Sequence, residues 1–310
     1  MARPRLALTV GDPAGIGPEI VLRALASDER PHAEYVIYGP AAELRARAQR
    51  FGLPLPKEEV VDVACDPIVL GRVSAAAGRA AADAVLRAAA DARAGRVDAL
   101  VTAPLNKESL HAAGHPWPGH TEMLADAAGV SDVAMMFVGG ALRVALLTIH
   151  RSLRSVPDAI TRDAVLRVGR LVHRELPRLG GRGPIAFCGV NPHAGEGGLF
   201  GDEESRVLAP ALAVLRGEGI DVTGPLPADS VFVRAARGEF AAVVACYHDQ
   251  GLIPVKLAAF GHAVNVTLGL PFVRTSVDHG TGFDIVEKGI AEEGSLLAAM
   301  KLAAELVGRV

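Results

Sequence analysis

LALTVGDPAGIGPEIVLRAL, residues 6–25, contains the first passage from strand to helix in this 310-residue chain. Residues 6–10 are mostly apolar and predict a buried strand, and the apolar spacing of residues 20–25 predicts a helix. Gly11-Asp12-Pro13 separates the two. A strand that passes through a short turn into a helix is the repeating unit of parallel α/β sheets, so we predict an α/β fold.

The same alternation continues along the chain. Further strands are predicted at 35–38, 99–102, 144–148, 185–190 and 242–246, and helices at 75–94, 162–176, 204–218 and 293–307. Several of these strands end in a segment that contains Gly, His or Asp. Because ligands of open α/β sheets bind at the carboxyl edge, we expect the site there.

Composition limits the classes of protein. A 310-residue chain that is 50% hydrophobic predicts a sizeable core and two domains. The net charge of -3 gives no basic surface for nucleic acid, which favours a small-molecule partner. Cys65, Cys188 and Cys246 lie in apolar runs and indicate buried reduced thiols, as in the cytoplasm. We find neither a signal peptide nor a run of eighteen apolar residues, so no membrane span is expected.

The turn of residues 11–19 is a candidate anion site. Gly15 and Gly17 allow a close backbone approach, and a helix N-terminus attracts negative charge. The G-x-G-x-x-G spacing of a Rossmann fold is absent. The alternative is a glycine turn that only caps the helix.

A second polar segment follows the strand predicted at 99–102. Lys107, His120 and Thr121 are donors suited to phosphate or carboxylate. A single loop lysine is also commonly a solvated charge, and Glu122 is explained equally well as a first-turn carboxylate that favours the helix dipole.

Three of the ten histidines follow predicted strands directly: His150, His193 and His248. Imidazole is a common metal ligand, and three such ligands leave coordination positions open for substrate oxygens. Their spacing matches no local zinc motif, so the prediction depends on their equivalent place at the sheet edge. The alternative is that each histidine is a structural hydrogen-bonding group. His32, His111, His115, His173 and His262 are interpreted as surface residues.

Other polar residues lie near these histidines in the sequence. They are Asp229, Asp249, Lys256, Asn265 and Arg274. Oxidation of a hydroxy acid needs a proton acceptor, a group that polarises the alcohol, and cations for the acid and phosphate, and this set supplies them. Alternatively, Asp249 and Lys256 form a structural ion pair.

Taken together, these segments resemble the 4-hydroxythreonine-4-phosphate dehydrogenase family of vitamin B6 biosynthesis. The resemblance extends over nearly the whole chain, and its blocks are 11–19, 119–122, 191–196, 247–251 and 278–281. It implies a fold like that of isocitrate and isopropylmalate dehydrogenases: two α/β/α lobes with a cleft between them, and not a Rossmann fold. We expect lobe one at 1–125 plus 260–310, and lobe two, with the metal histidines and dimer interface, at 126–259.

The resemblance also implies roles for individual residues. His150, His193 and His248 are the expected ligands of one divalent ion, Zn, Mg or Co, with one ligand donated by the partner of a homodimer. The expected substrate contacts are His120, Thr121, Lys256, Asn265 and Arg274. Asp229, Asp249 and Lys256 are expected near the chemistry, and Asp12, Gly15 and Gly17 near NAD or NADP.

The implied reaction is oxidation of the 3-hydroxyl of 4-(phosphooxy)-L-threonine by NAD or NADP, followed by loss of carbon dioxide. Related families use the same histidines on phosphorylated threonate or erythronate, or on aromatic dihydrodiol carboxylates, so the scaffold leaves the substrate open. Two other classes are a catalytically silent binding protein and an acyltransferase of the phosphotransacetylase type. The silent protein would be favoured if a ligand histidine or Lys256 were missing, and none is missing. The acyltransferase would not need three metal-ligand histidines.

Overall fold

The computed structural model describes residues 3–308 and divides the chain into two compact units. Unit 1 comprises Met1–Ser131 and Leu270–Val310, and unit 2 comprises Asp132–Gly269. The chain thus leaves the first unit and returns to it. Both division points lie later in the chain than the expected limits after residues 125 and 259.

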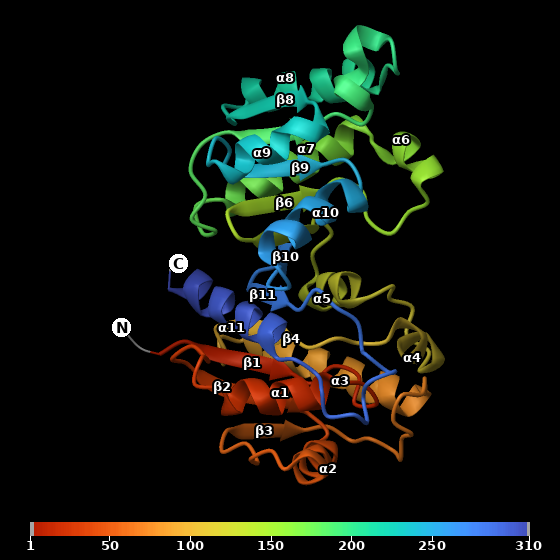
Figure 1. Ribbon diagram of the computed structural model, residues 1–310, viewed down its shortest axis with the longest axis vertical. Helices are drawn as coiled ribbons and strands as arrows, with labels where there is room; N and C mark the ends of the chain where they lie inside the picture. Colours follow the sequence, from red (N-terminus) through yellow and green to blue (C-terminus); the bar gives the residue numbers. More distant parts are fainter. Residues whose placement is uncertain (1–2, 309–310) are drawn as a thin grey trace. The chain divides into compact units, whose positions relative to one another are not determined.

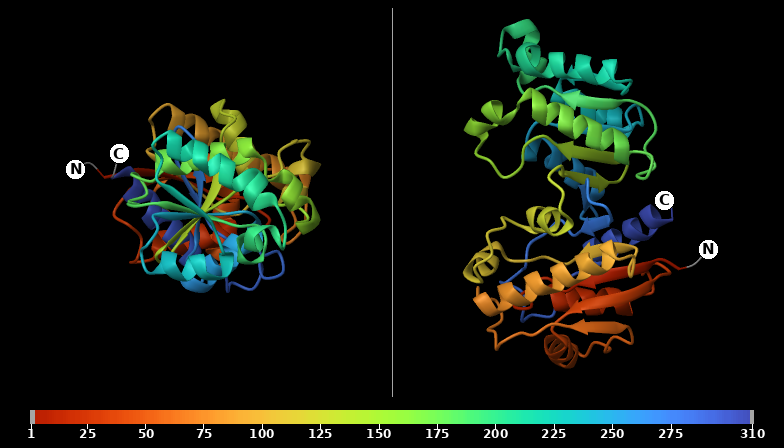
Figure 2. Two further views of the ribbon diagram at one scale, coloured as in Figure 1. Left: turned by 90° about the horizontal axis from the view of Figure 1, so that it is seen from above. Right: turned by 180° about the vertical axis from the view of Figure 1, so that it is seen from behind.

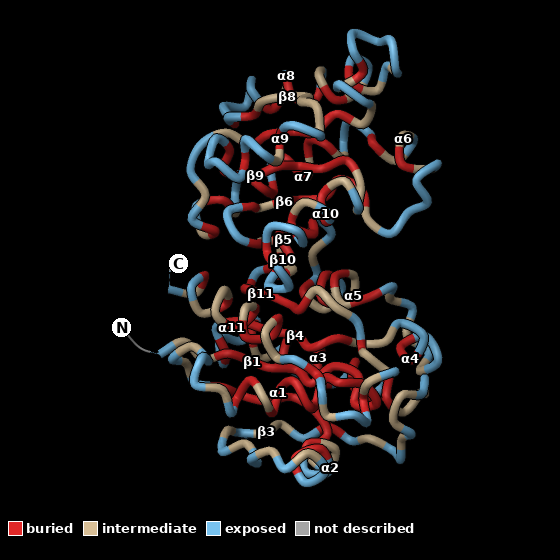
Figure 3. Tube along the Cα trace, in the orientation of Figure 1, coloured by how far each residue is buried: buried red, intermediate tan, exposed pale blue. Residues whose placement is uncertain are grey.

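Unit 1 contains five parallel strands in the order β3-β2-β1-β4-β11. Their bounds are β1 Arg5–Thr9, β2 Glu34–Gly39, β3 Glu59–Asp62, β4 Ala99–Thr102 and β11 Val273–Ser276. Leu6, Leu8, Ile37 and Leu100 are completely buried, and Figure 3 shows the trace buried along β1. Strands covered on both faces read as continuous apolar runs, which is why the sequence revealed β1, β2 and β4, whereas β3 and β11 were not predicted.

Helices cover both faces of these strands. They are α1 Gly17–Ala26, α2 Ala41–Phe51, α3 Ala75–Arg93, α4 Lys107–Ala112, α5 His120–Ala128 and α11 Gly294–Val307. Figure 1 shows α1 and α11 in front of the strands, and α3, in orange, is in front when the molecule is seen from behind (Figure 2). The Ser74 hydroxyl caps α3 by accepting from the Ala77 amide at 3.1 Å.

Unit 2 contains six strands in the order β10-β5-β6-β9-β7-β8. Their bounds are β5 Ala134–Gly139, β6 Leu142–Leu146, β7 Ile185–Cys188, β8 Val222–Leu226, β9 Ala242–Ala245 and β10 Val264–Leu268. The pairs β10–β5 and β5–β6 are antiparallel, whereas β6–β9, β9–β7 and β7–β8 are parallel. The prediction of a mainly parallel sheet is therefore right for the strands that precede the three histidines.

The helices of unit 2 also lie on both faces. The longer ones are α7 Arg162–Glu175, α8 Ala209–Gly217, α9 Ala228–Ala236 and α10 His248–Ala259, and α6 Val156–Ala159 is a single turn. Leu153–Ser155 is a 3-10 turn, Pro192–Gly198 is a tight loop with left-handed φ at residues 193–197, and Glu204–Leu208 is a π-helical turn that leads into α8. Helices α9 and α10 are in front in Figure 1, and α7 is in front in the rear view of Figure 2.

The structure confirms the α/β class and corrects details of the sequence prediction. The helix expected at 204–218 begins as a π-helical turn, and β3, β5, β8, β10 and β11 were not predicted. Four of these five are short or interrupted by polar residues, whereas β5 is a six-residue apolar run that the prediction overlooked. Cys188 and Cys246 are buried free thiols as expected, whereas Cys65 is only half-buried because it lies in the irregular segment after β3. Among residues 3–308, no helix combines the length and apolar character needed to span a membrane.

Candidate active site

The three histidines predicted as ligands follow three neighbouring strands of unit 2. His150 comes after β6, His248 after β9 and His193 after β7, and the sheet order is β6-β9-β7. These strands are parallel, so their carboxyl ends lie at one edge. The topology therefore gives the three residues the equivalent placement on which the sequence prediction depended.

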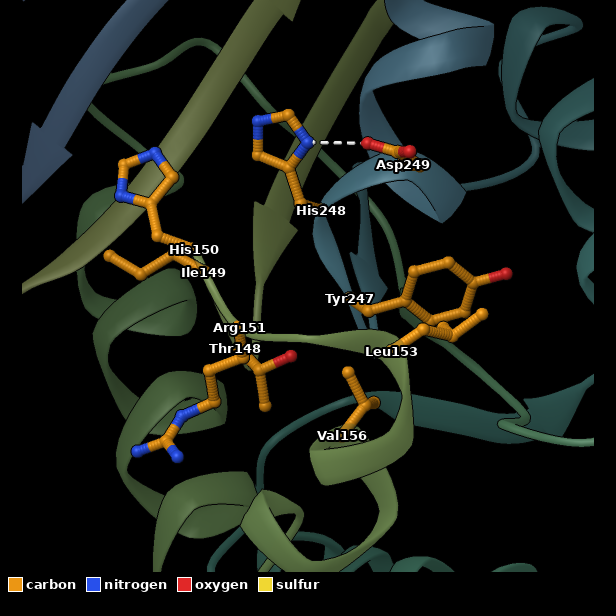
Figure 4. A pocket seen from close by; sticks show the side chains of 9 residues that line it. All are labelled: Thr148, Ile149, His150, Arg151, Leu153, Val156, Tyr247, His248 and Asp249. Carbon is orange, nitrogen blue, oxygen red and sulfur yellow. Dashed lines mark hydrogen bonds and ion pairs between the residues drawn. The ribbon is translucent and has the colours of Figure 1, made fainter.

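His150 and His248 lie beside each other in a cavity of about 280 Å³. Their ring centroids are 5.8 Å apart. Figure 4 shows the two imidazoles at one end of the cavity, with Tyr247, Leu153 and Val156 at the other. An imidazole nitrogen lies about 2 Å from a bound metal, so this ring separation is compatible with two ligands of one ion.

Asp249 orients the His248 ring. The Asp249 Oδ1 atom lies 2.7 Å from His248 Nδ1, and Figure 4 draws this contact as a dashed line. When Nδ1 donates its proton to a carboxylate, the lone pair of Nε2 remains available to a metal, which is the usual arrangement around histidine ligands. The residues present thus fit a divalent metal, and Asp249 has the geometry of an orienting group.

His193 belongs to a strained loop between β7 and α8. His193 has a φ of 53° and residues 193–197 all have positive φ, of which only Gly195 and Gly197 are glycines. His150 also has a positive φ, of 32°. Left-handed conformations of other residues cost about 1 kcal/mol or more and are concentrated at functional sites.

A buried carboxylate accepts hydrogen bonds from the start of this loop. Glu204 is 5% exposed, and its Oε1 accepts from the Val190 amide at 2.7 Å and from the Asn191 amide at 2.8 Å. The Asn191 side-chain nitrogen donates to Glu204 Oε2 at 3.0 Å and to Glu203 at 2.7 Å. These contacts fix the backbone immediately before His193.

One chain brings together two of the three predicted ligands. The His193 ring packs 6.5 Å from the Phe200 ring, and residues 3–308 contain no group of three or more His, Cys, Asp or Glu side chains that could hold a metal ion. The arrangement is therefore a two-histidine half-site with a third histidine on a neighbouring loop.

A separate polar cluster lies in unit 1. Arg274, on β11, is 2% exposed, and its Nη2 donates to the Thr102 hydroxyl at 2.7 Å. Burial lowers the pKa of Arg274 to about 9, although the charge of Glu122 raises it. Burial, and secondarily the charge of Arg274, holds the pKa of His120 well below its usual value. The cluster thus pairs a buried cation with a neutral imidazole.

The remaining substrate candidates divide between the two units. Thr121 is buried on α5 of unit 1, next to His120, whose Nε2 is buried without a hydrogen-bond partner in the described part of the chain. Asn265, on β10 of unit 2, has a similarly unpartnered Oδ1. Lys256 is exposed on α10, about 12 Å along the helix axis from His248. Asp229 is exposed in the first turn of α9 and does not line the described cavity.

The glycine turn of unit 1 has a packing explanation. A Cβ on Gly17 would lie 1.9 Å from the Val10 carbonyl oxygen, and one on Gly15 would lie 2.7 Å from that of Thr281. Asp12 is completely buried and caps the turn by accepting from the Ala14 amide at 2.9 Å. Burial raises the Asp12 pKa, although the Ala14 amide and Ser109 lower it. The space beside both glycines is thus occupied by the protein itself.

Several residues of the site were not predicted. Thr148, Tyr247 and Arg151 line the cavity beside the two histidines, and their positions within two residues of His150 or His248 were a usable signal. Figure 4 shows the Arg151 side chain directed away from both rings. Glu204 had no such signal, because it follows the 193–201 loop in the sequence and reaches back to the Val190 amide only in the folded chain.

Comparisons with known proteins agree with the predicted resemblance. The family described as "Pyridoxal phosphate biosynthetic protein PdxA" matches residues 19–303. The chain is 44% identical to a 4-hydroxythreonine-4-phosphate dehydrogenase of Geobacter metallireducens, covering 98% of this chain and 96% of the relative. It is 46% identical to a D-threonate 4-phosphate dehydrogenase of Cupriavidus necator, covering 99% and 98%.

Solved structures extend the comparison to the fold. The crystal structure of a 4-hydroxythreonine-4-phosphate dehydrogenase from Klebsiella pneumoniae has a TM-score of 0.92 and 43% identity, over 99% of this chain and 100% of that one. A terephthalate 1,2-cis-dihydrodiol dehydrogenase from Burkholderia xenovorans has a TM-score of 0.66 and 36% identity, over 97% and 98%.

A more distant likeness concerns the fold alone. A beta-decarboxylating dehydrogenase from Thermococcus kodakarensis has a TM-score of 0.54 at 14% identity, over 98% of this chain and 84% of that one. This agrees with the expectation of a fold like that of such dehydrogenases, whereas the absence of a Rossmann fold stays a prediction. On the full-length match to its sequence and the agreement in fold, the chain belongs to the PdxA family.

Proposed function

We propose that this protein is an NAD- or NADP-dependent dehydrogenase of 4-(phosphooxy)-L-threonine. The proposed product is 3-amino-2-oxopropyl phosphate, formed with carbon dioxide in pyridoxine 5'-phosphate biosynthesis. The observation that carries the proposal is full-length similarity, at 43–44% identity, to proteins named 4-hydroxythreonine-4-phosphate dehydrogenase. In this reaction the C3 hydrogen leaves as hydride to the nicotinamide and the hydroxyl loses its proton. The bond between C2 and the carboxylate then breaks, carbon dioxide leaves, and C2 takes up a proton.

A divalent ion, Zn, Mg or Co, is proposed at His150, His248 and His193. When bound, it polarises the substrate oxygen and stabilises negative charge that develops there. The close pair of His150 and His248 and the Asp249 contact to Nδ1 support this assignment. Since one chain assembles two ligands, we propose that a homodimer completes each site with a histidine from the second subunit.

An exposed apolar stripe supports the homodimer. Ile253 and Leu257 lie one turn apart on α10 and are 59% and 69% exposed, and Phe260, the residue that caps the end of α10, is 86% exposed. Apolar side chains of this size are normally covered by a partner when they cluster. Because α10 begins at His248, a partner on this stripe would lie next to the metal half-site.

The chain's own residues are proposed to bind the anionic parts of the substrate. In unit 1 these are His120, Thr121 and Arg274, and a buried cation beside a neutral imidazole is suited to a phosphate or carboxylate. In unit 2, Lys256 offers a further cation, and the unpartnered amide oxygen of Asn265 would accept from a hydroxyl or amino group of the substrate rather than from its anionic parts.

The proton-handling and cofactor roles are assigned more broadly. Asp249 is proposed to hold the His248 tautomer, and Asp229 and Lys256 are the candidates for moving the hydroxyl proton. Asp12, with Gly15 and Gly17, remains our proposal for the neighbourhood of the nicotinamide nucleotide, which would lie against a turn that the protein has already packed firmly. We place the activity in the cytoplasm, where the buried free thiols Cys188 and Cys246 stay reduced.

A second candidate substrate is D-threonate 4-phosphate. The observation that favours it is the 46% identity to a protein named D-threonate 4-phosphate dehydrogenase. The two substrates differ at C2, which carries an amine in one and a hydroxyl in the other. None of the anion-binding residues discriminates between these groups, so the choice depends on measurement.

The test is nicotinamide reduction by the purified full-length protein with each substrate, with NAD and NADP separately, and with or without a divalent metal. We expect turnover with 4-(phosphooxy)-L-threonine that is lost on chelation and in His248→Ala. The matched control is His173→Ala, which removes an exposed histidine from α7. Higher kcat/KM with D-threonate 4-phosphate or with an aromatic dihydrodiol carboxylate would overturn the substrate, and metal-independent turnover would overturn the metal site.

A further inference from the structure

Backbone pairing ends before the three histidines are reached. The last paired residues of β6 and β9 are Leu146 and Ala245, and only the Leu147 amide, which donates to Ala245 at 2.9 Å, extends that ladder. Between β9 and β7 the pairing ends at Val244 and Phe187. The sheet therefore does not by itself fix the spacing of the segments that carry the histidines.

Three side chains continue the cross-strand connection beyond this point: those of Thr148 and Gln250, and the Cys246 thiol, which donates to the Cys188 carbonyl at 3.3 Å. The Thr148 hydroxyl, two residues beyond the end of β6, donates to the Cys246 carbonyl at 2.7 Å. The Cys246 amide donates to Gln250 Oε1 at 2.7 Å, and Gln250 Nε2 donates to the Gly189 carbonyl at 2.9 Å. A continuous chain of hydrogen bonds thus crosses the ends of β6, β9 and β7 in turn.

Each link lies close to a proposed ligand. Thr148 precedes His150 by two residues, and Cys246 precedes His248 by two. Gly189 begins the segment that Glu204 fixes before His193. The Thr148 bond is buried, so water does not replace it readily if the hydroxyl is removed.

We propose that Thr148 and Gln250 are positioning residues that set the separation of His150 and His248 and tie both to the His193 loop. The proposal rests on the proposed metal site. A ligand set must be held within a fraction of an ångström, and polar groups behind the ligands commonly supply that precision. Loss of these bonds should therefore weaken metal binding more than it weakens the fold.

The test measures Co²⁺ affinity of the full-length protein by calorimetry, together with the thermal unfolding midpoint of the metal-free protein. Thr148→Val and Gln250→Met keep side-chain volume and remove the bonds, and we expect the Co²⁺ Kd to rise roughly 10- to 100-fold. Gln250→Glu keeps the acceptor for Cys246 and loses the donor to Gly189, so its Kd should lie between these variants and wild type. Thr148→Ser keeps the hydroxyl and should restore binding.

Thr275→Val is the matched control. Thr275 also donates a buried hydroxyl to a backbone carbonyl, that of Ala299 at 2.8 Å, but it lies in unit 1. Thr275→Val should lower the thermal unfolding midpoint as Thr148→Val does, and it should leave the Co²⁺ Kd unchanged. Equal Kd values in wild type, Thr148→Val and Gln250→Met would overturn the positioning role and leave the metal site intact. Absence of Co²⁺ binding to wild type would instead overturn the proposed metal function and this inference with it.

Discussion

Glu204→Gln is expected to loosen the loop that carries His193. The Glu204 carboxylate is buried and accepts from three donors: the amides of Val190 and Asn191 and the side-chain nitrogen of Asn191. A glutamine oxygen can still accept from the two backbone amides. Its nitrogen, however, would then face the Asn191 nitrogen at the present 3.0 Å, where both groups are donors.

The magnitude follows from these contacts. One charge-assisted bond is lost and a donor is left without an acceptor, which costs about 2 kcal/mol. Rotation of the Asn191 amide would relieve the clash only by breaking its 2.7 Å bond to Glu203, so it offers no cheaper solution. Glu204→Ala removes all three bonds and should lower the free energy of unfolding by about 3 kcal/mol. The loss is no larger because Asn191 is partly exposed, so water can bind its freed donors.

Hydrogen exchange of the Val190 and Asn191 amides is the direct assay, with urea unfolding as the global measure. A loss of 2 kcal/mol corresponds to roughly 30-fold faster exchange where exchange follows local opening. Glu203→Gln is the control, since a half-exposed glutamine can still accept from Asn191, and it should change stability by less than about 0.5 kcal/mol. Unchanged exchange at both amides in Glu204→Gln would refute the assigned role of the carboxylate.

Three further predictions concern other parts of the chain. Gly17→Ala should destabilise the protein by about 3 kcal/mol or more, because its Cβ would overlap the Val10 carbonyl oxygen. In the control Gly217→Ala, the added Cβ meets no atom within 4 Å, so this variant should be neutral. Urea unfolding of both variants measures the difference. Burial lowers the His120 pKa in the folded state, so the unfolded state takes up a proton first as the pH falls below about 6.5. The free energy of unfolding should therefore fall by up to about 1.4 kcal/mol per pH unit in that range. The same pH dependence of unfolding in His120→Gln would contradict this. Leu257→Glu should convert the proposed dimer to monomer without unfolding, and light scattering that still shows a dimer would exclude α10 as the interface.

Local patterns were sufficient for most of the fold. The buried strands β1, β4 and β9 were visible as short apolar runs, and α3, α7 and α11 as longer segments with helical spacing. Apart from β5, the strands that were missed contain polar or half-exposed positions, such as Asn265 in β10, so their apolar signal is interrupted. The antiparallel pairing of β5 could not be predicted, because the direction of a strand in a sheet depends on distant neighbours.

The sequence by itself determined which residue types stand at the strand ends: His150, His193 and His248 in unit 2, and the glycine turn of unit 1. Only the tertiary structure decided that β6, β9 and β7 are neighbours, that two of the three histidines share a cavity, and that Glu204 and Gln250 hydrogen-bond to the backbone before His193 and His248. It also decided that Gly15 and Gly17 are packed against the protein's own carbonyl groups. The physical reason is that periodicity and residue type act over a few positions of the chain, whereas contacts between strand ends join residues far apart in sequence and exist only once the sheet order is set.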